Sequence, residues 1–105
     1  MKRQSKNNGG TSLEQLADGE FKISGDLDFQ TVPAMWQKSL ALFANCPSIQ
    51  IDLSGVNRST SAGLALLIEW MRFARSRNLS IAFHNLPIQM REIARVCEVE
   101  TKLPI

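Results

Sequence analysis

The chain has 105 residues, of which 44% are hydrophobic, and its formal net charge is +2 at pH 7. This length is typical of one domain with a modest core. The small net charge gives no basis for nucleic-acid binding, which normally needs a dense stripe of basic and aromatic residues. The sequence has no signal peptide pattern and no apolar stretch near about eighteen residues. We therefore expect a cytoplasmic protein without direct membrane insertion.

The N-terminal segment from Met1 to Gly10 is polar and weakly basic and ends in two glycines, which predicts a disordered tail before a domain over residues 11–105. Leu13 and Leu16 mark a first, weakly patterned strand, and Asp18-Gly19 predicts a two-residue hairpin turn. Apolar and polar residues then alternate in the next predicted strand, Glu20 to Ser24. Such half-covered strands favour a sheet with helices mainly on one face.

Thr31 predicts a helix N-cap, with Pro33 in the first turn, and Asn45-Cys46-Pro47 predicts the end of that helix. We assign one face of this helix to the core, namely Val32, Met35, Trp36, Ser39 and Phe43. Upstream of the helix, Asp26 and Asp28 could join Asp52 at one sheet edge as a metal or acid site. Turn positions explain the first two carboxylates better.

The segment from Ile49 to Leu53 alternates between apolar and polar residues, which predicts a strand with one covered face. Ser54 and Gly55 are expected to end this strand. A polar run from Arg58 to Ser61 leads into a helix with apolar residues at helical spacing. A hydroxyl residue before such a pattern is an N-cap signal. Ser61 is therefore expected in or next to the first turn, where free N–H groups and the helix dipole favour an anion.

The hydroxyl residues at this junction allow several interpretations. A nucleotide P-loop is excluded, because Leu64 follows Gly63 where that motif requires lysine. The hydroxyls could only cap the helix, or Ser61 could accept a phosphoryl group, whose charge is favourable at a helix N-terminus. A third possibility is an anion site in a small enzyme or ligand carrier.

The central helix has two apolar stripes. Four residues cover the arc assigned to the core: Leu64, Leu67, Ile68 and Met71. Leu66, Trp70 and Phe73 form a second stripe on the flank. Either the neighbouring helix covers this flank, which we favour, or Trp70 is exposed and marks a binding site for a protein partner.

The C-terminal part is predicted to contain a strand from Leu79 to Phe83, parallel to the central strand, and a last helix that Pro87 opens. The buried stripe of that helix is expected to be Met90, Ile93, Ala94 and Cys97. Its expected solvent-facing residues are Arg91, Glu92, Arg95 and Glu98. The segment from Val99 to Ile105 carries no clear pattern.

Few residues suggest catalysis. Cys46 and Cys97 lack the spacing of a metal site or a Cys-x-x-C pair, and both are expected to be reduced and buried. The single histidine, His84, has no nucleophile and base pattern around it, so we expect it to form a hydrogen bond at a strand end. The sequence predicts no catalytic residue, no metal site, no cofactor and no enzyme activity.

The central stretch carries a resemblance to a known family. The pattern Ile51 to Ser54, Val56, and a polar loop with Ser61 two residues before Gly63-Leu64 resembles the signature of STAS domains, the modules of anti-anti-sigma factors. The resemblance extends upstream to Gly25-Asp26-Leu27-Asp28 and covers nearly all of the chain from Thr11 onward. It implies a single α/β domain with a small mixed sheet and helices mainly on one face.

Further positions are most similar to Mla-type STAS proteins, the small cytoplasmic subunits of the phospholipid-trafficking ABC transporter of Gram-negative bacteria. These positions are Gly63 to Leu67, Arg58, Val32 and Trp36. The resemblance implies a non-catalytic subunit that binds the transporter ATPase and supports it. The transporter maintains outer-membrane lipid asymmetry. The subunit is then expected at the inner face of the inner membrane, held there by its partner. The residues expected to bind the partner are Asn57, Arg58, Ser59, Thr60, Ser61, Ala62, Leu66 and Trp70.

The alternative is a regulator of the anti-anti-sigma type. In that case a serine kinase or anti-sigma factor is the partner, and phosphorylation of Ser61 blocks binding. Thr60 stands where the family usually has an aspartate, so a carboxylate beside the candidate phosphoacceptor is missing. This departure favours a junction that docks on a partner.

Overall fold

The computed structural model describes residues 11–105, and the tail predicted for Met1 to Gly10 lies outside these residues. Four strands and three α-helices make up the described chain. In chain order the elements are β1 (Ser12–Ala17), β2 (Glu20–Leu27), α1 (Val32–Phe43), β3 (Ser48–Ser59), α2 (Ser61–Ser76), β4 (Ser80–His84) and α3 (Ile88–Val96), followed by the 3-10 helix η3 (Glu100–Lys102).

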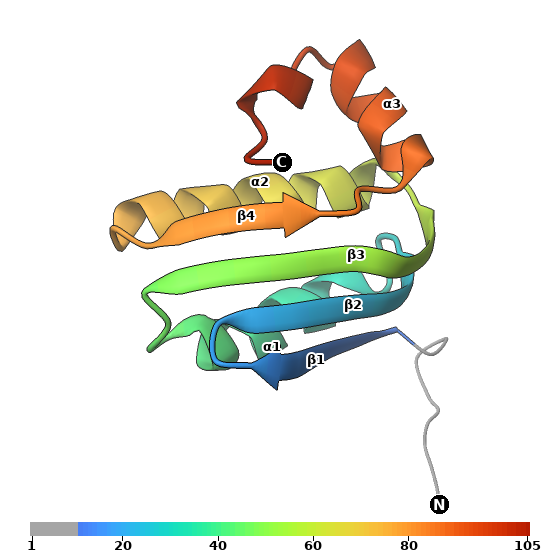
Figure 1. Ribbon diagram of the computed structural model, residues 1–105. Coiled ribbons are helices and arrows are strands. Elements are labelled where there is room, and N and C mark those ends of the chain that lie inside the picture. Colours follow the sequence, from blue (N-terminus) through green and yellow to red (C-terminus); the bar gives the residue numbers. More distant parts are fainter. Residues whose placement is uncertain (1–10) are drawn as a thin grey trace, which may run out of the picture.

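The four strands form one mixed sheet in the order β1-β2-β3-β4. β1 and β2 are antiparallel and are joined by the predicted Asp18-Gly19 turn, in which Gly19 has a φ of 74°. β2, β3 and β4 are parallel, so their carboxyl ends meet at one edge, on the right in Figure 1. The chain passes from β3 into α2 at that edge, while α1 and α2 lie behind the sheet.

One face of the sheet is apolar and the other is polar. In the centre of the sheet, Ile23, Ile49, Ile51 and Leu53 are fully buried, whereas their polar neighbours along the strands are only partly buried. Alternating burial of this kind means that helices cover one face. The prediction of a single α/β domain with a small mixed sheet and helices mainly on one face is confirmed.

The prediction that Ser54 and Gly55 end the central strand is wrong, because β3 continues to Ser59. Gly55 pairs with Ser24 where the register shifts, and a Cβ atom on Gly55 would overlap the Ser24 hydroxyl and the Ile23 carbonyl oxygen. The missing side chain lets the two strands stay paired at this irregularity. The pairing carries β2 on to Leu27, so Asp26 is a strand residue and not a turn residue.

The start of α1 uses a different cap from the one expected. Thr31 occupies the N-cap position, but its side chain makes no capping bond. Instead, the Asp28 carboxylate accepts from the Gln30 and Thr31 backbone N–H groups at 2.9 and 3.0 Å. The Thr31 hydroxyl donates to the Asp26 carbonyl oxygen at 2.9 Å. Asp28 is therefore a turn residue, as predicted, and its carboxylate caps the turn that leads into α1.

The second apolar stripe of α2 packs inside the protein. Leu66 and Trp70 are 2% and 0% exposed. The Trp70 indole N–H donates to the buried Ser39 hydroxyl of α1 at 2.8 Å, and the Trp70 and Phe43 ring centroids are 5.5 Å apart. Phe73 is partly buried, with its ring centroid 6.3 Å from that of Trp36. The neighbouring helix thus covers this flank, as favoured from the sequence.

The C-terminal part departs from the prediction at Cys97, which was expected in the buried stripe of the last helix. Met90 and Ala94 are buried and Ile93 is partly buried, but Cys97 is exposed because the helix ends at Val96. Cys46 and Cys97 are both free, and Cys46 is only partly buried, so the expected burial of both thiols is wrong. Beyond α3 the chain returns to the sheet edge, where the Phe83 N–H donates to the Pro104 carbonyl oxygen at 2.8 Å.

Candidate functional site

The candidate site is the junction between β3 and α2. β3 ends at Ser59, Thr60 has extended backbone angles, and α2 begins at Ser61. The Thr60 hydroxyl accepts from the Ala62 N–H at 3.1 Å, which is the N-cap bond that the sequence predicts. The Thr60 N–H donates to the Leu27 carbonyl oxygen at 3.0 Å and so ties the junction to the end of β2. The junction is therefore held in place and is not a free loop.

Close packing beneath the junction depends on Gly63. A Cβ atom at this position would overlap the Ser59 hydroxyl and would lie 3.1 Å from both Leu27 Cβ and Met90 Cε. The absence of a side chain therefore allows the first turn of α2 to pack directly against the strand ends and α3. Thr60 and Ser61, just before this packed turn, are exposed at the protein surface.

The predicted partner-binding residues divide into two groups. Asn57, Arg58, Thr60 and Ser61 are exposed at the junction. The others are buried, namely Ser59, Ala62, Leu66 and Trp70. Leu66 and Trp70 belong to the interior between α1 and α2, so the expectation that they contact a partner is corrected: the structure leaves neither side chain accessible.

A groove beside the junction was not predicted. It has a volume of about 500 Å³ and lies between Arg58 to Thr60 on one side and α3 on the other. The residues of α3 and its end that line it are Gln89, Glu92, Ile93, Val96 and Cys97. The Ser59 N–H donates to the Gln89 side-chain oxygen at 3.4 Å and connects the two walls. In the sequence, the signal for this surface was Val96, an apolar residue of the last helix that lies outside the predicted buried stripe.

Two further apolar side chains are exposed at the same edge of the sheet. Phe29 follows β2 and is 75% exposed, while Ile88 follows β4 and is 76% exposed. With Val96 at 81%, these are the most exposed large hydrophobic residues of the described chain. A cluster of exposed apolar side chains marks a surface that binds another protein, whereas singly exposed ones are common on any protein.

The first turn of α2 contains no acidic residue. The positive end of the helix dipole therefore has no competing carboxylate on the helix, while the Ala62 and Gly63 N–H groups are already bonded to Thr60. Ser61 is exposed, and its position suits a phosphoryl group or a polar group of a partner equally well. The junction itself supplies neither a general base nor a nucleophile-activating group next to Ser61.

Asp52 and His84 lie away from the junction. On the polar face of the sheet, a hydrogen bond from Asn85 and one from the Ser54 N–H lower the pKa of Asp52 below its usual range. His84 forms a hydrogen bond with Gln50, which confirms the role predicted for it.

Within residues 11–105, no group of three His, Cys, Asp or Glu side chains could hold a metal ion. In the same range, no helix is both long enough and apolar enough to span a bilayer.

Comparison with known families identifies the class of protein. The model of the STAS domain family described as "Mlab, STAS domain" matches residues 13–104. This range covers all of the helices and strands, apart from Ser12, the first residue of β1. The chain therefore belongs to the STAS domain family of this Mlab type. Comparison with curated protein sequences gives no match.

Solved structures with the same fold include a chain of an MlaFEDB complex and two anti-sigma factor antagonists. The chain is 24% identical to a chain of an Acinetobacter MlaFEDB complex in an ATP-bound conformation, with a TM-score of 0.71 over 87% of this chain and 97% of that one. An anti-sigma factor antagonist from Mycobacterium paratuberculosis is 27% identical, with a TM-score of 0.67 over 90% and 81% of the two chains. The unphosphorylated anti-sigma factor antagonist SpoIIAA is 16% identical, with a TM-score of 0.70 over 90% and 85%.

Proposed function

We propose that this protein is a non-catalytic STAS subunit that binds the cytoplasmic ATPase of a phospholipid-trafficking ABC transporter of the Mla type. In this role it supports the assembly or activity of the ATPase and so helps to maintain outer-membrane lipid asymmetry. It is held at the inner face of the inner membrane through its partner. The observation that carries the proposal is the match of an Mlab-type family model to residues 13–104.

The geometry of the junction supports this proposal. Thr60 and Ser61 are exposed on a rigid support, because the N-cap bond and the bond to β2 hold the backbone. Phe29 and Ile88 add exposed apolar area at the same edge. A preorganised polar centre with apolar surroundings loses little conformational entropy when a partner binds. The junction has no arrangement of residues typical of catalysis, and no group of three His, Cys, Asp or Glu side chains within residues 11–105 could hold a metal ion.

The proposed mechanism is differential binding. A subunit that binds one conformation of the ATPase more tightly increases the population of that conformation. It also stabilises the bound ATPase against unfolding by mass action. No chemical step on this chain is required for either effect.

The test is to purify the tagged protein from its native host in mild detergent and to identify the co-purifying proteins by mass spectrometry. We expect an ABC ATPase together with its membrane permease. Ser61→Glu should abolish this recovery, because the added carboxylate changes the centre of the docking surface. Arg72→Ala serves as the matched control, since Arg72 is an exposed residue further along α2. Recovery of neither protein with the wild-type chain would refute the proposal.

A second candidate is an anti-sigma factor antagonist that is switched by phosphorylation of Ser61. Two observations favour it: Ser61 is exposed at a helix N-terminus, and two of the similar structures are anti-sigma factor antagonists. A phosphoryl group there would add about two negative charges next to the positive end of the helix dipole. Thr60 in place of the usual aspartate weighs against this candidate.

The two candidates differ in a modification that can be measured directly. Phosphopeptide analysis of the protein from its native host should detect no phosphate on Ser61 if the transporter role is correct. Recovery of a soluble serine kinase, together with phosphate on Ser61, would refute the transporter role and establish the switch. Loss of binding in Ser61→Glu does not separate the two candidates, because both predict it.

A further inference from the structure

The α3 wall of the groove carries apolar surface that the rest of the described chain leaves partly uncovered. Val96 is 81% exposed, and Ile93, one turn earlier on α3, is only partly buried. Cys97 adds an exposed, weakly polar side chain to the same wall. The volume of about 500 Å³ is enough for a few side chains of a partner protein.

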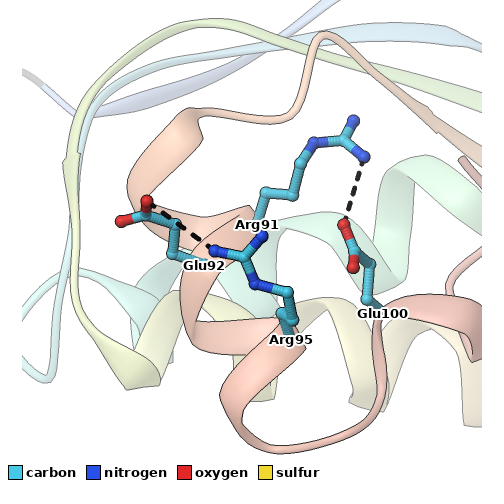
Figure 2. A network of polar contacts seen from close by, with 4 residues as sticks. All are labelled: Arg91, Glu92, Arg95 and Glu100. Carbon is cyan, nitrogen blue, oxygen red and sulfur yellow. Dashed lines mark hydrogen bonds and ion pairs between the residues drawn. The ribbon is translucent and has the colours of Figure 1, made fainter.

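The cations near the groove differ in their ion pairing. Two of them, both on α3, are paired within the chain, as Figure 2 shows: Arg91 with Glu100 at 3.4 Å and Arg95 with Glu92 at 3.9 Å. Arg58, on the opposite wall, takes part in none of the ion pairs formed by residues 11–105. Its cross-strand neighbour Asp26 lines a different hollow, between β1 and α1. Within the described chain, Arg58 is thus the exposed cation of the groove that has no carboxylate partner.

Two charge effects favour an anionic group at this wall. Arg58 supplies a positive charge, and the N-terminus of α2 directly after Thr60 adds the positive end of the helix dipole. Glu92 on the far wall is partly neutralised by Arg95. A single cation next to a carboxylate does not suit an anionic membrane surface, which attracts clusters of several basic residues. A protein segment with one carboxylate fits this charge pattern better.

We propose that the groove binds a segment of the partner that presents an apolar side chain next to a carboxylate, the apolar group packing on Ile93 and Val96 and the carboxylate pairing with Arg58. This inference rests on the proposed function, since the partner is the ATPase. It extends the docking surface from the β3–α2 junction to α3. It also assigns a chemical character to the part of the ATPase that docks there.

The test uses the ATPase recovered with the wild-type protein, purified, and measures its dissociation constant for a set of variants. Arg58→Glu and Val96→Asp should each weaken binding by about tenfold or more, because a desolvated charge pair or an apolar contact is replaced by a repulsive or unpaired charge. Arg58→Lys, which keeps the charge, should lose less. Arg72→Glu, a charge reversal at an exposed site elsewhere on α2, is the control and should bind normally.

Three outcomes are distinguishable, provided that thermal melts show every variant folded. If the wild-type protein fails to bind the ATPase, the proposed function and this inference both fail. If Ser61→Glu abolishes binding while Arg58→Glu and Val96→Asp bind like the wild type, the groove inference fails and the proposed function stands. In a third outcome, the Arg58→Glu variant binds weakly to the wild-type ATPase but regains affinity when one Asp or Glu of the ATPase is replaced by Lys. This result would confirm the charge pair.

Discussion

The two parts of α2 have opposite surroundings. In the middle of the helix, Leu66 and Trp70 are almost completely buried, and Trp70 is hydrogen-bonded to Ser39 of α1. At the N-terminus, Thr60 and Ser61 are exposed and their surroundings are polar. About two turns of one helix separate these environments. The comparison teaches that the most hydrophobic side chains of a helix stabilise the domain, whereas the short polar turn at its end is available for recognition.

This division of roles leads to a clear expectation for mutations. Changes in the middle of α2 should lower the free energy of unfolding and affect binding only through folding. Changes at its N-terminus should affect binding while the domain stays folded. A residue that breaks this rule in either direction would show that the two regions are coupled.

The largest effect is expected for Trp70→Ala. Trp70 is fully buried and lies against Phe43, so its removal leaves a large cavity and takes away the N–H group that donates to the buried Ser39 hydroxyl. Such truncations lower the free energy of unfolding by about 3–5 kcal/mol. Urea denaturation followed by circular dichroism measures this loss. Arg72→Ala, at an exposed site half a turn further along the helix, is the control. A loss of unfolding free energy below about 1 kcal/mol for Trp70→Ala would contradict the observed packing.

A smaller loss is expected for Ser39→Ala. The buried Ser39 hydroxyl accepts from the Trp70 indole N–H at 2.8 Å and donates to the Trp36 carbonyl oxygen. Removing it leaves a buried donor without an acceptor, which costs about 1–3 kcal/mol of unfolding free energy. Ser76→Ala is a matched control, because Ser76 also donates to the carbonyl three residues earlier but is exposed. Equal effects of the two substitutions would show that the bond to Trp70 contributes nothing.

At the other end of the helix, Thr60→Ala removes the side-chain oxygen that accepts from the Ala62 N–H. Loss of an N-cap of this kind costs about 1 kcal/mol. Thr60→Ser keeps the hydroxyl and should preserve most of the stability. Thermal unfolding of the three proteins measures the effect, and binding of the ATPase in the same series shows whether the cap also positions Ser61. If Thr60→Ser is as unstable as Thr60→Ala, the threonine methyl group and not the cap is responsible.

The sequence predicted the parts of this comparison that depend on local patterns. The alternation from Ile49 to Leu53 and the hydroxyl residue before an apolar helix located the strand and the start of α2. Periodicity favoured burial of the Trp70 flank but could not establish it, because the spacing of apolar residues does not show which neighbour covers a second stripe. The residue that hydrogen-bonds Trp70 there is Ser39, which is 31 positions away in the chain.

Other features depend on contacts between distant segments. The extension of β3 beyond Gly55 follows from its pairing with Ser24, which the strand's own sequence does not encode. The groove forms because Gln89 of α3 lies against Ser59, a contact across 30 positions. Cys97 seemed part of the buried stripe by spacing, but it lies just beyond the last residue of the helix. Spacing alone cannot fix a helix end to within one residue.

The smallest effect on stability is expected for Ser61→Ala. The Ser61 side chain is exposed, forms no hydrogen bond with residues 11–105, and occupies a helical position where alanine is favourable. The free energy of unfolding should therefore change by no more than about 0.5 kcal/mol. Isothermal titration with the ATPase should nevertheless show weaker binding if the hydroxyl is in the contact. Unchanged affinity for Ser61→Ala, together with a loss for Arg58→Glu, would move the centre of recognition from the helix N-terminus to the groove beside α3.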